Sequence, residues 1–155
     1  MKLILENESD TLKLGVAISN AIQEVEYQQI EIHLSGNLGA GKTTLVRGIL
    51  QGFDWHDLVT SPSYTLCEEY EINNKLFLHI DLYRINSIED VEVLNLDRVT
   101  TKQKIIFIEW PENLIEKRDS DLIINLFHDN HRRQASLETK IAEMSSSIKV
   151  YYENI

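Results

Sequence analysis

Residues 34–44 read LSGNLGAGKTT, and residues 36–43 match the pattern G-x-x-x-x-G-K-[ST] at every required position. Glycines let the backbone curl so that successive N–H groups point inward and form a cradle for an anion. The pattern IEIHL at 30–34 predicts a strand before this glycine loop, and residues 43–51 predict a helix after it, with Gly52 as its stop. That helix adds its positive N-terminal end and its unpaired amides. The stretch therefore predicts a site for a nucleoside triphosphate.

The side chains of the loop indicate how a triphosphate is held. Lys42 is expected to reach the β- and γ-phosphates as a point charge, and the Thr43 hydroxyl is expected to ligate Mg²⁺. The alternative is a glycine-rich turn with an accidental lysine, which would match by chance in roughly one chain of this length in a few hundred. The predicted nucleotide-binding residues of the loop are Gly36, Asn37, Leu38, Gly39, Ala40, Gly41, Lys42, Thr43 and Thr44.

Two apolar runs end in a carboxylate, LFLHID at residues 76–81 and IIFIE at residues 105–109. The second run is more fully apolar, which predicts a central strand beside the strand of the glycine loop, and ligands in such sheets gather at the carboxyl ends of strands. Glu109 is therefore the first choice for the metal, and Asp81 is expected to orient water or a loop near the γ-phosphate. The alternative is that either acid only ends a strand at the surface. Lys42, Asp81 and Glu109 are the predicted catalytic residues.

Several other polar residues have weaker interpretations. His79, on an apolar strand, is more often a structural histidine than a catalyst. Trp110 either packs beside the nucleotide or fills the core. His128 and His131 have no cysteine at metal-ligand spacing, so a zinc site is not expected.

Composition limits the class of protein. The 155 residues are 43% apolar and 26% charged, which is typical of one globular domain spanning residues 1–155. With 15 basic and 25 acidic side chains the net charge is −10, which disfavours unaided binding to nucleic acid. A small positive patch around Lys102, Lys104 or Arg132-Arg133 is expected to make one or two phosphate contacts at most.

The lone Cys67 excludes an intrachain disulfide. No apolar run approaches the roughly 20 residues that span a bilayer, so no membrane contact and a cytoplasmic protein are expected.

Hydrophobic periodicity predicts the remaining elements. Beyond the loop region we expect a strand at 2–5, a helix capped by Ser9, strands at 64–71 and 75–82 joined at Asn73-Asn74, a short acidic helix at 89–96, and strands at 104–108, 121–127 and 133–139. The last fifteen residues are ambiguous. This order predicts an α/β fold of the P-loop NTPase type, with three layers, a mixed sheet with a parallel core, and flanking helices.

Missing motifs narrow the enzyme class. A guanine-selective N-K-x-D is absent, since residues 74–77 read NKLF, and no D-x-x-G follows Asp81 or Glu109. A GTPase is therefore not expected. A P-loop small-molecule kinase remains the alternative, although the chain has no arginine-rich insertion for a lid. A nucleotide-sensing module without turnover also remains open.

Four motifs occur in an order that resembles a known family. They are GNLGAGKTT at 36–44, SPSYTL at 61–66, HIDLYR at 79–84 and IEWPE at 108–112. Together they resemble the TsaE (formerly YjeE) family of bacterial P-loop ATPases, from about Thr11 to Arg133. The resemblance implies a Mg²⁺-dependent ATPase that acts with the TsaD and TsaB proteins in the threonylcarbamoylation of adenosine 37 in tRNAs reading codons that begin with adenine. It further implies slow hydrolysis without partners and tRNA contact only through them.

The resemblance also implies roles for single residues. Lys42 and the loop amides would bind the phosphates of ATP, and Thr43 with Glu109 would bind Mg²⁺. Asp81 would be needed for hydrolysis, and residues 61–66 would form a mobile, switch-like segment. Thr11 matches a family threonine near the adenine, and Arg133 matches an arginine close to the nucleotide.

Three positions depart from the family pattern. Ser63 stands where threonine is usual and keeps the hydroxyl, whereas Asn37 replaces an aspartate whose side chain the anion cradle does not require. Asn95 replaces a common glycine after the acidic helix, so the turn there is expected to differ. The tail after Lys140 matches nothing in the family pattern.

Overall fold

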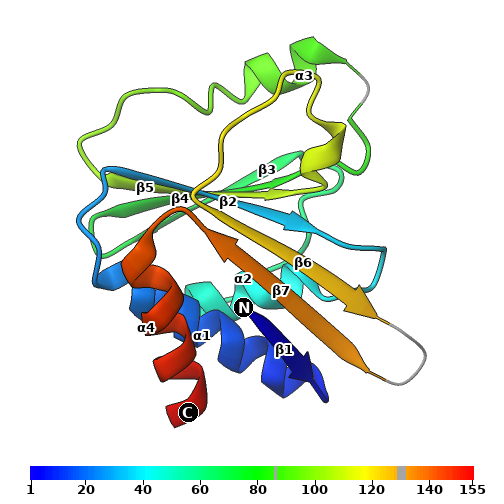
Figure 1. The fold of residues 1–155 in the computed structure, drawn as a ribbon. Coiled ribbons are helices and arrows are strands. Elements are labelled where there is room, and N and C mark those ends of the chain that lie inside the picture. Colours follow the sequence, from blue (N-terminus) through cyan, green and yellow to red (C-terminus); the bar gives the residue numbers. More distant parts are fainter. Residues whose placement is uncertain (86, 129–131) are drawn as a thin grey trace.

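The computed structural model describes residues 1–85, 87–128 and 132–155 (Figure 1). Its strands are β1 (Lys2–Leu5), β2 (Gln29–Ser35), β3 (Cys67–Ile72), β4 (Lys75–Asp81), β5 (Gln103–Glu109), β6 (Leu122–His128) and β7 (Arg133–Thr139). Its helices are α1 (Glu8–Gln23), α2 (Lys42–Gln51), α3 (Ile88–Val93) and α4 (Ala142–Asn154), with a 3-10 turn at Pro111–Asn113.

The seven strands form one sheet in the order β1-β7-β6-β2-β5-β4-β3. The four central strands, β6, β2, β5 and β4, run parallel. β3 and β7 pair antiparallel to β4 and β6, and β1 pairs antiparallel to β7. β5 therefore lies directly beside the strand that leads into the glycine loop, as its apolar run predicts. The carboxyl ends of β2, β4 and β5 meet at one edge of the sheet, with Leu34 and Asp81 both opposite Glu109 in register.

Both faces of the central sheet are covered, which is why residues 105–108 of β5 are continuously apolar. α1, α2 and α4 pack on one face, and α3 with its flanking loops lies over the other (Figure 1). On β5, Ile105 and Phe107 belong to the core under α1 and α2, whereas Ile106 and Ile108 belong to the smaller core on the α3 side. The expected three-layer α/β architecture with a parallel core is confirmed.

Two predicted boundaries at the starts of elements are wrong. α1 is capped by Asn7 and not by Ser9, because the Asn7 side chain accepts a hydrogen bond of 3.1 Å from the Asp10 amide. β3 begins at Cys67 and not at Tyr64, because Leu66 adopts a left-handed φ of 64° that turns the chain before the strand.

The ends of two helices, α2 and α3, differ from expectation. Gly52 follows α2 as predicted, but its φ of −67° is right-handed, and a Cβ there would lie 1.8 Å from the Ser19 hydroxyl. The glycine is therefore required by the close approach of α1. The acidic helix α3 ends at Val93, and Asn95 then adopts a left-handed φ of 45°, which asparagine tolerates in the place of glycine. The ambiguous tail forms α4, which packs on α1 through Met144 and Ile148.

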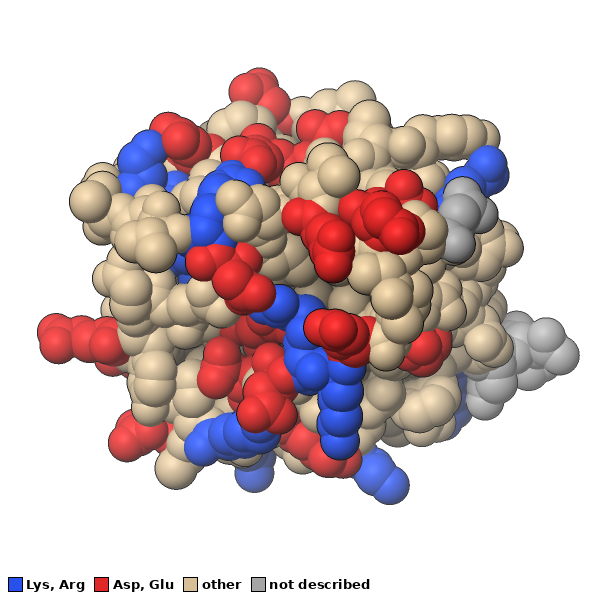
Figure 2. All heavy atoms as spheres, turned by 90° about the horizontal axis from the view of Figure 1, so that it is seen from above, with Lys and Arg blue, Asp and Glu red and all other residues tan. Residues whose placement is uncertain are grey.

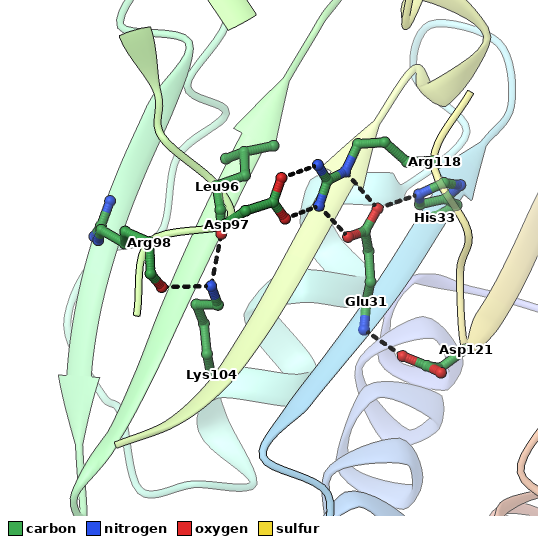
Figure 3. Close-up of polar contacts among 8 residues, drawn as sticks. All are labelled: Glu31, His33, Leu96, Asp97, Arg98, Lys104, Arg118 and Asp121. Atoms are coloured by element: carbon green, nitrogen blue, oxygen red, sulfur yellow. Dashed lines mark hydrogen bonds and ion pairs between the residues drawn. The ribbon is translucent and has the colours of Figure 1, made fainter. Parts of the chain in front are cut away.

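A buried ionic network ties the segment after α3 to the sheet (Figure 3). Glu31 on β2 is 3% exposed, and its carboxylate accepts hydrogen bonds of 3.1 and 2.8 Å from the Arg118 guanidinium. The same guanidinium donates two bonds of 2.8 Å to Asp97, and His33 lies 2.8 Å from Glu31 on the other side. Arg118 thus connects the centre of the sheet to the chain that follows α3.

Replacing Arg118 with alanine is expected to lower the free energy of unfolding by about 2 kcal/mol, because it leaves the Glu31 charge buried beside only His33. Burial opposes ionisation of Glu31, but hydrogen bonds from His33 and Arg118 outweigh it and hold its pKa below the usual range. A carboxylate with a depressed pKa stabilises the fold above its unfolded pKa and loses that contribution as the pH falls. The difference between wild type and R118A should therefore narrow below about pH 4.3.

Denaturant unfolding at pH 7 and along a descending pH series measures this difference. Arg98→Ala is the matched control, since its guanidinium pairs with the half-exposed Glu69 and its loss should change stability by less than about 1 kcal/mol. Equal destabilisation by both variants would contradict the assignment of Arg118 as the residue that connects the sheet to the chain after α3.

Candidate functional site

The glycine loop connects β2 to α2 in a conformation that depends on its glycines. Gly36, Gly39 and Gly41 have φ values of 143°, 78° and 105°. A Cβ on Gly36 would lie 2.3 Å from the Leu126 carbonyl oxygen, so only glycine lets the loop pass this close to β6. At Gly39 a Cβ would meet nothing within 4 Å, because that part of the loop faces open space. The loop therefore offers an open concave backbone above the start of α2.

The first turn of α2 is available to an anion. The helix begins at Lys42 after Gly41, and among the described residues no side chain caps its N-terminus and no acidic residue occupies its first turn. The unpaired amides of a helix start carry partial positive charge and bind phosphate groups. The structure thus places the glycine loop next to an uncapped helix start, the arrangement that the predicted cradle requires.

The Lys42 ammonium lies folded against its own loop. Its Nζ donates hydrogen bonds of 2.6 Å to the Gly36 carbonyl and 3.2 Å to the Asn37 carbonyl, and lies 4.0 Å from the centre of the Trp110 ring. Burial lowers the pKa of Lys42, while the charges of Glu109, Asp81 and Glu112 oppose that shift. Trp110 is half-buried and also packs on Tyr83, with 5.0 Å between ring centres, so it covers the lysine beside the loop.

The Thr43 hydroxyl donates a hydrogen bond of 2.9 Å to Oε1 of Glu109. These two residues are far apart in sequence, and they meet because α2 starts above the carboxyl end of β5. A hydroxyl and a carboxylate next to a phosphate cradle are the oxygen ligands that Mg²⁺ takes in nucleotide sites, with phosphate oxygens and water completing its shell. The residues present therefore fit a magnesium ion.

His79 touches the same carboxylate oxygen. It is fully buried on β4, and its Nε2 lies 2.8 Å from Oε1 of Glu109. Its Nδ1 has no hydrogen-bond partner among the described residues. The interpretation of His79 as a satisfied structural histidine therefore holds for one ring nitrogen only.

Asp81 is 3% exposed at the end of β4 and joins two other segments. It accepts hydrogen bonds from the Ser61 hydroxyl and, at 2.9 Å, from the Tyr83 amide. Ser61 begins the segment at residues 61–66, which the family resemblance predicts to be switch-like. Asp81 thus contacts that segment directly, while Glu109 contacts Thr43.

A cleft of about 500 Å³ lies between these elements. Of the predicted residues it is lined by Leu38, Gly39, Gly41, Lys42, Thr43, Thr44, Asp81, Glu109 and Arg133. Gly36 and Asn37 line a neighbouring cavity of about 380 Å³, and Ala40 is buried beneath the loop. Trp110 also lines the cleft, which is the first of its two interpretations from the sequence. The sequence does not assign Tyr83 and Arg84 to the cleft wall, although their positions shortly after the strand-end carboxylate Asp81 are the signal that points to it.

Basic side chains outnumber the carboxylates of Asp81 and Glu109 on the cleft wall, in contrast to the whole protein. Lys42, Arg84 and Arg133 all line it, and the Arg84 guanidinium lies 4.3 Å from the centre of the exposed Tyr64 ring. An acidic protein can hold a phosphate group by such local donors, because charges beyond about 8–10 Å are screened at physiological salt.

Thr11 lies beneath the loop and not on the cleft wall. It is fully buried in α1, and its methyl group is 3.7 Å from the place of a Cβ on Gly41. Its hydroxyl has no partner among the described residues. A role near the adenine stays a prediction for this residue.

Two findings concern all the residues that the structure describes. In residues 1–85, 87–128 and 132–155 no cluster of three or more histidine, cysteine, aspartate or glutamate side chains is arranged to hold a metal ion, and His131 lies outside these ranges. Within the same ranges, no helix has the length and apolar character needed to cross a membrane.

Comparison with known proteins shows the family and the fold of this chain. Residues 5–136 match the profile of the family described as threonylcarbamoyl adenosine biosynthesis protein TsaE. The tRNA threonylcarbamoyladenosine biosynthesis protein TsaE of Haemophilus influenzae is 35% identical over 133 residues, covering 83% of each chain. That of Aquifex aeolicus is 32% identical over 142 residues, covering 90% of this chain and 96% of its own.

A crystal structure of a Bacillus YdiB protein superposes with a TM-score of 0.70 at 21% identity, covering 99% of this chain and 95% of the other, which shows the fold alone. The P-loop NTPase-like fold and the resemblance carried by the four motifs are both confirmed. The chain belongs to the TsaE family, whose members take part in threonylcarbamoyladenosine biosynthesis in tRNA.

Proposed function

We propose that residues 1–155 form one Mg²⁺-dependent ATPase domain that acts in the cytoplasm with the TsaD and TsaB proteins in the threonylcarbamoylation of adenosine 37 in tRNA. Membership of the TsaE family supports the pathway. The observation that carries the ATPase chemistry is the Thr43–Glu109 contact of 2.9 Å beside an uncapped helix start and a glycine loop. Positioning and charge neutralisation are what such a site needs for phosphoryl transfer to water.

Each residue of the cleft has a role in this proposal. The loop amides and the start of α2 hold the phosphates, and Thr43 with Glu109 holds Mg²⁺, which when bound neutralises charge on the phosphate oxygens. Lys42 leaves the carbonyls of Gly36 and Asn37 to reach the phosphates. Asp81 orients the attacking water or couples the γ-phosphate to the segment that begins at Ser61. Nucleotide binding therefore rearranges hydrogen bonds that the free protein makes within its own loop.

We further propose that tRNA is contacted only through the partner proteins. On the face drawn in Figure 2, basic and acidic side chains alternate. Lys102 pairs with Glu71 at 2.5 Å, and Lys104 is 3% exposed and donates to the carbonyls of Leu96 and Arg98 at 2.7 and 2.9 Å. Of the patch expected around Lys102, Lys104 or Arg132-Arg133, Lys104 therefore contributes no exposed charge, and the charge of Lys102 is balanced by Glu71. A net charge of −10 supports indirect action on RNA.

Measurement of phosphate release from ATP, with and without TsaD and TsaB of the same source, tests the proposal. We expect slow release by the chain alone, dependence on Mg²⁺, and acceleration when both partners are present. Partners without this chain provide the control. Transfer of the γ-phosphate to a small-molecule acceptor would instead identify a kinase, and tight ATP binding with no turnover even beside the partners would identify a nucleotide-sensing module.

A further inference from the structure

The buried imidazole of His79 donates to the carboxylate that holds the metal in the function proposed above. An ionised carboxylate only accepts hydrogen bonds, so Nε2 carries the proton in the 2.8 Å contact with Oε1 of Glu109. Oε1 also accepts from the Thr43 hydroxyl at 2.9 Å. Both donors reach the same oxygen, one from β4 and one from α2, and neither uses Oε2. These two bonds hold the carboxylate in one orientation, and Oε2 receives no hydrogen bond from either donor.

The imidazole has no other polar contact in the described part of the chain. Its Nδ1 is buried without a hydrogen-bond partner, and its ring packs edge-on to Phe107, with 6.5 Å between ring centres. Burying a polar ring with one nitrogen unsatisfied is unfavourable, and an apolar side chain at this place in the core would avoid that penalty. The bond to Glu109 is the one interaction that an apolar residue cannot make.

We propose that His79 is a positioning residue for magnesium, which orients Glu109 and so raises the affinity of the nucleotide site for the metal. Partners that hydrogen-bond to a metal ligand fix its orientation, and their loss typically lowers metal affinity about 10–100-fold. This inference rests on the proposed function, because it takes Glu109 as the metal ligand. Nucleotide binding in the absence of metal does not depend on His79.

Isothermal titration with ATP, once in EDTA and once in MgCl₂, measures the gain in affinity that the metal provides. We expect His79→Leu to reduce that gain about tenfold while the affinity in EDTA stays at the wild-type value. His79→Gln keeps an amide donor and should recover most of the gain. Thermal unfolding verifies that each variant is folded, and His79→Phe, which keeps a ring beside Phe107, replaces His79→Leu if the latter does not fold.

The matched control is His33→Leu. His33 is 7% exposed and lies 2.8 Å from a buried carboxylate, that of Glu31, in the network of Figure 3 and outside the cleft. Its loss should leave the magnesium gain unchanged.

Three results would count against these assignments, each in a different way. An unchanged gain in folded His79→Leu or His79→Phe overturns the positioning role, and so does an equal loss of affinity in EDTA and in MgCl₂, which indicates general distortion. If wild-type protein shows no gain with Mg²⁺, the proposed function fails first.

Discussion

Replacing Lys42 with alanine is expected to lower the affinity for MgATP by at least about a hundredfold, because charge-assisted hydrogen bonds to phosphate contribute about 1.5–3 kcal/mol each. Lys42 is the cation within the glycine-loop motif itself, and it lines the cleft. Its Nζ lies 2.6 Å from the Gly36 carbonyl oxygen. Part of its interaction energy with phosphate is offset, since binding requires this bond and the bond to Asn37 to break. The loss of affinity is still expected to be large, because Lys42 gives up bonds to neutral carbonyls and gains bonds to charged phosphates.

Isothermal titration with ATP and Mg²⁺ measures the loss. We expect Lys42→Ala to fold, because the lysine contributes a charge and not an apolar side chain to the core, and the two carbonyls that it leaves lie in an open loop. Lys149→Ala is the matched control, as it removes the same charge from an exposed site on α4. Wild-type affinity in folded Lys42→Ala would refute the assignment of the loop as the phosphate site.

The two carboxylates are expected to respond differently to neutralisation. Glu109→Gln keeps the shape of the side chain but removes the charge opposite Thr43, so we expect the magnesium-dependent gain in ATP affinity to fall by more than about tenfold. Asp81→Asn should bind MgATP with little change, because Asp81 contacts Ser61 and Tyr83 and not Thr43. Its hydrolysis rate should fall about 10²–10⁴-fold, the range expected for the loss of a group that orients or activates water.

ATP titrations over a Mg²⁺ series and single-turnover hydrolysis separate these effects. Glu143→Gln, at an exposed position on α4, is the control for loss of one negative charge. The reverse pattern, with metal dependence lost in Asp81→Asn and only turnover lost in Glu109→Gln, would mean that the roles of the two carboxylates are exchanged.

The order of the elements follows from local patterns in the sequence. Apolar runs and alternating apolar residues predict the strands, and the errors at Ser9 and Tyr64 concern only the starts of elements. The error at Ser9 arises because Asn7 caps α1 as well as a serine can. The error at Tyr64 arises because the turn closed by the Leu66 amide and the Pro62 carbonyl has a leucine, and not a glycine, at its left-handed position. The placement of β5 beside β2 was predictable, since a strand that is apolar on both faces has to lie inside the sheet.

The sequence by itself determined the loop from which we propose the ligand class, because the glycine spacing imposes a backbone shape within eight consecutive residues. Only the tertiary structure decided which side chains meet there. Thr43 and Glu109 are 66 residues apart, and His79 lies 30 residues before Glu109. Their contacts depend on strand register and on the seating of α2 over β5, and no short-range pattern contains that information. Lys104 likewise reads as a surface charge in the sequence but is buried in the fold, because the chain after α3 folds back so that the carbonyls of Leu96 and Arg98 replace water around its ammonium group.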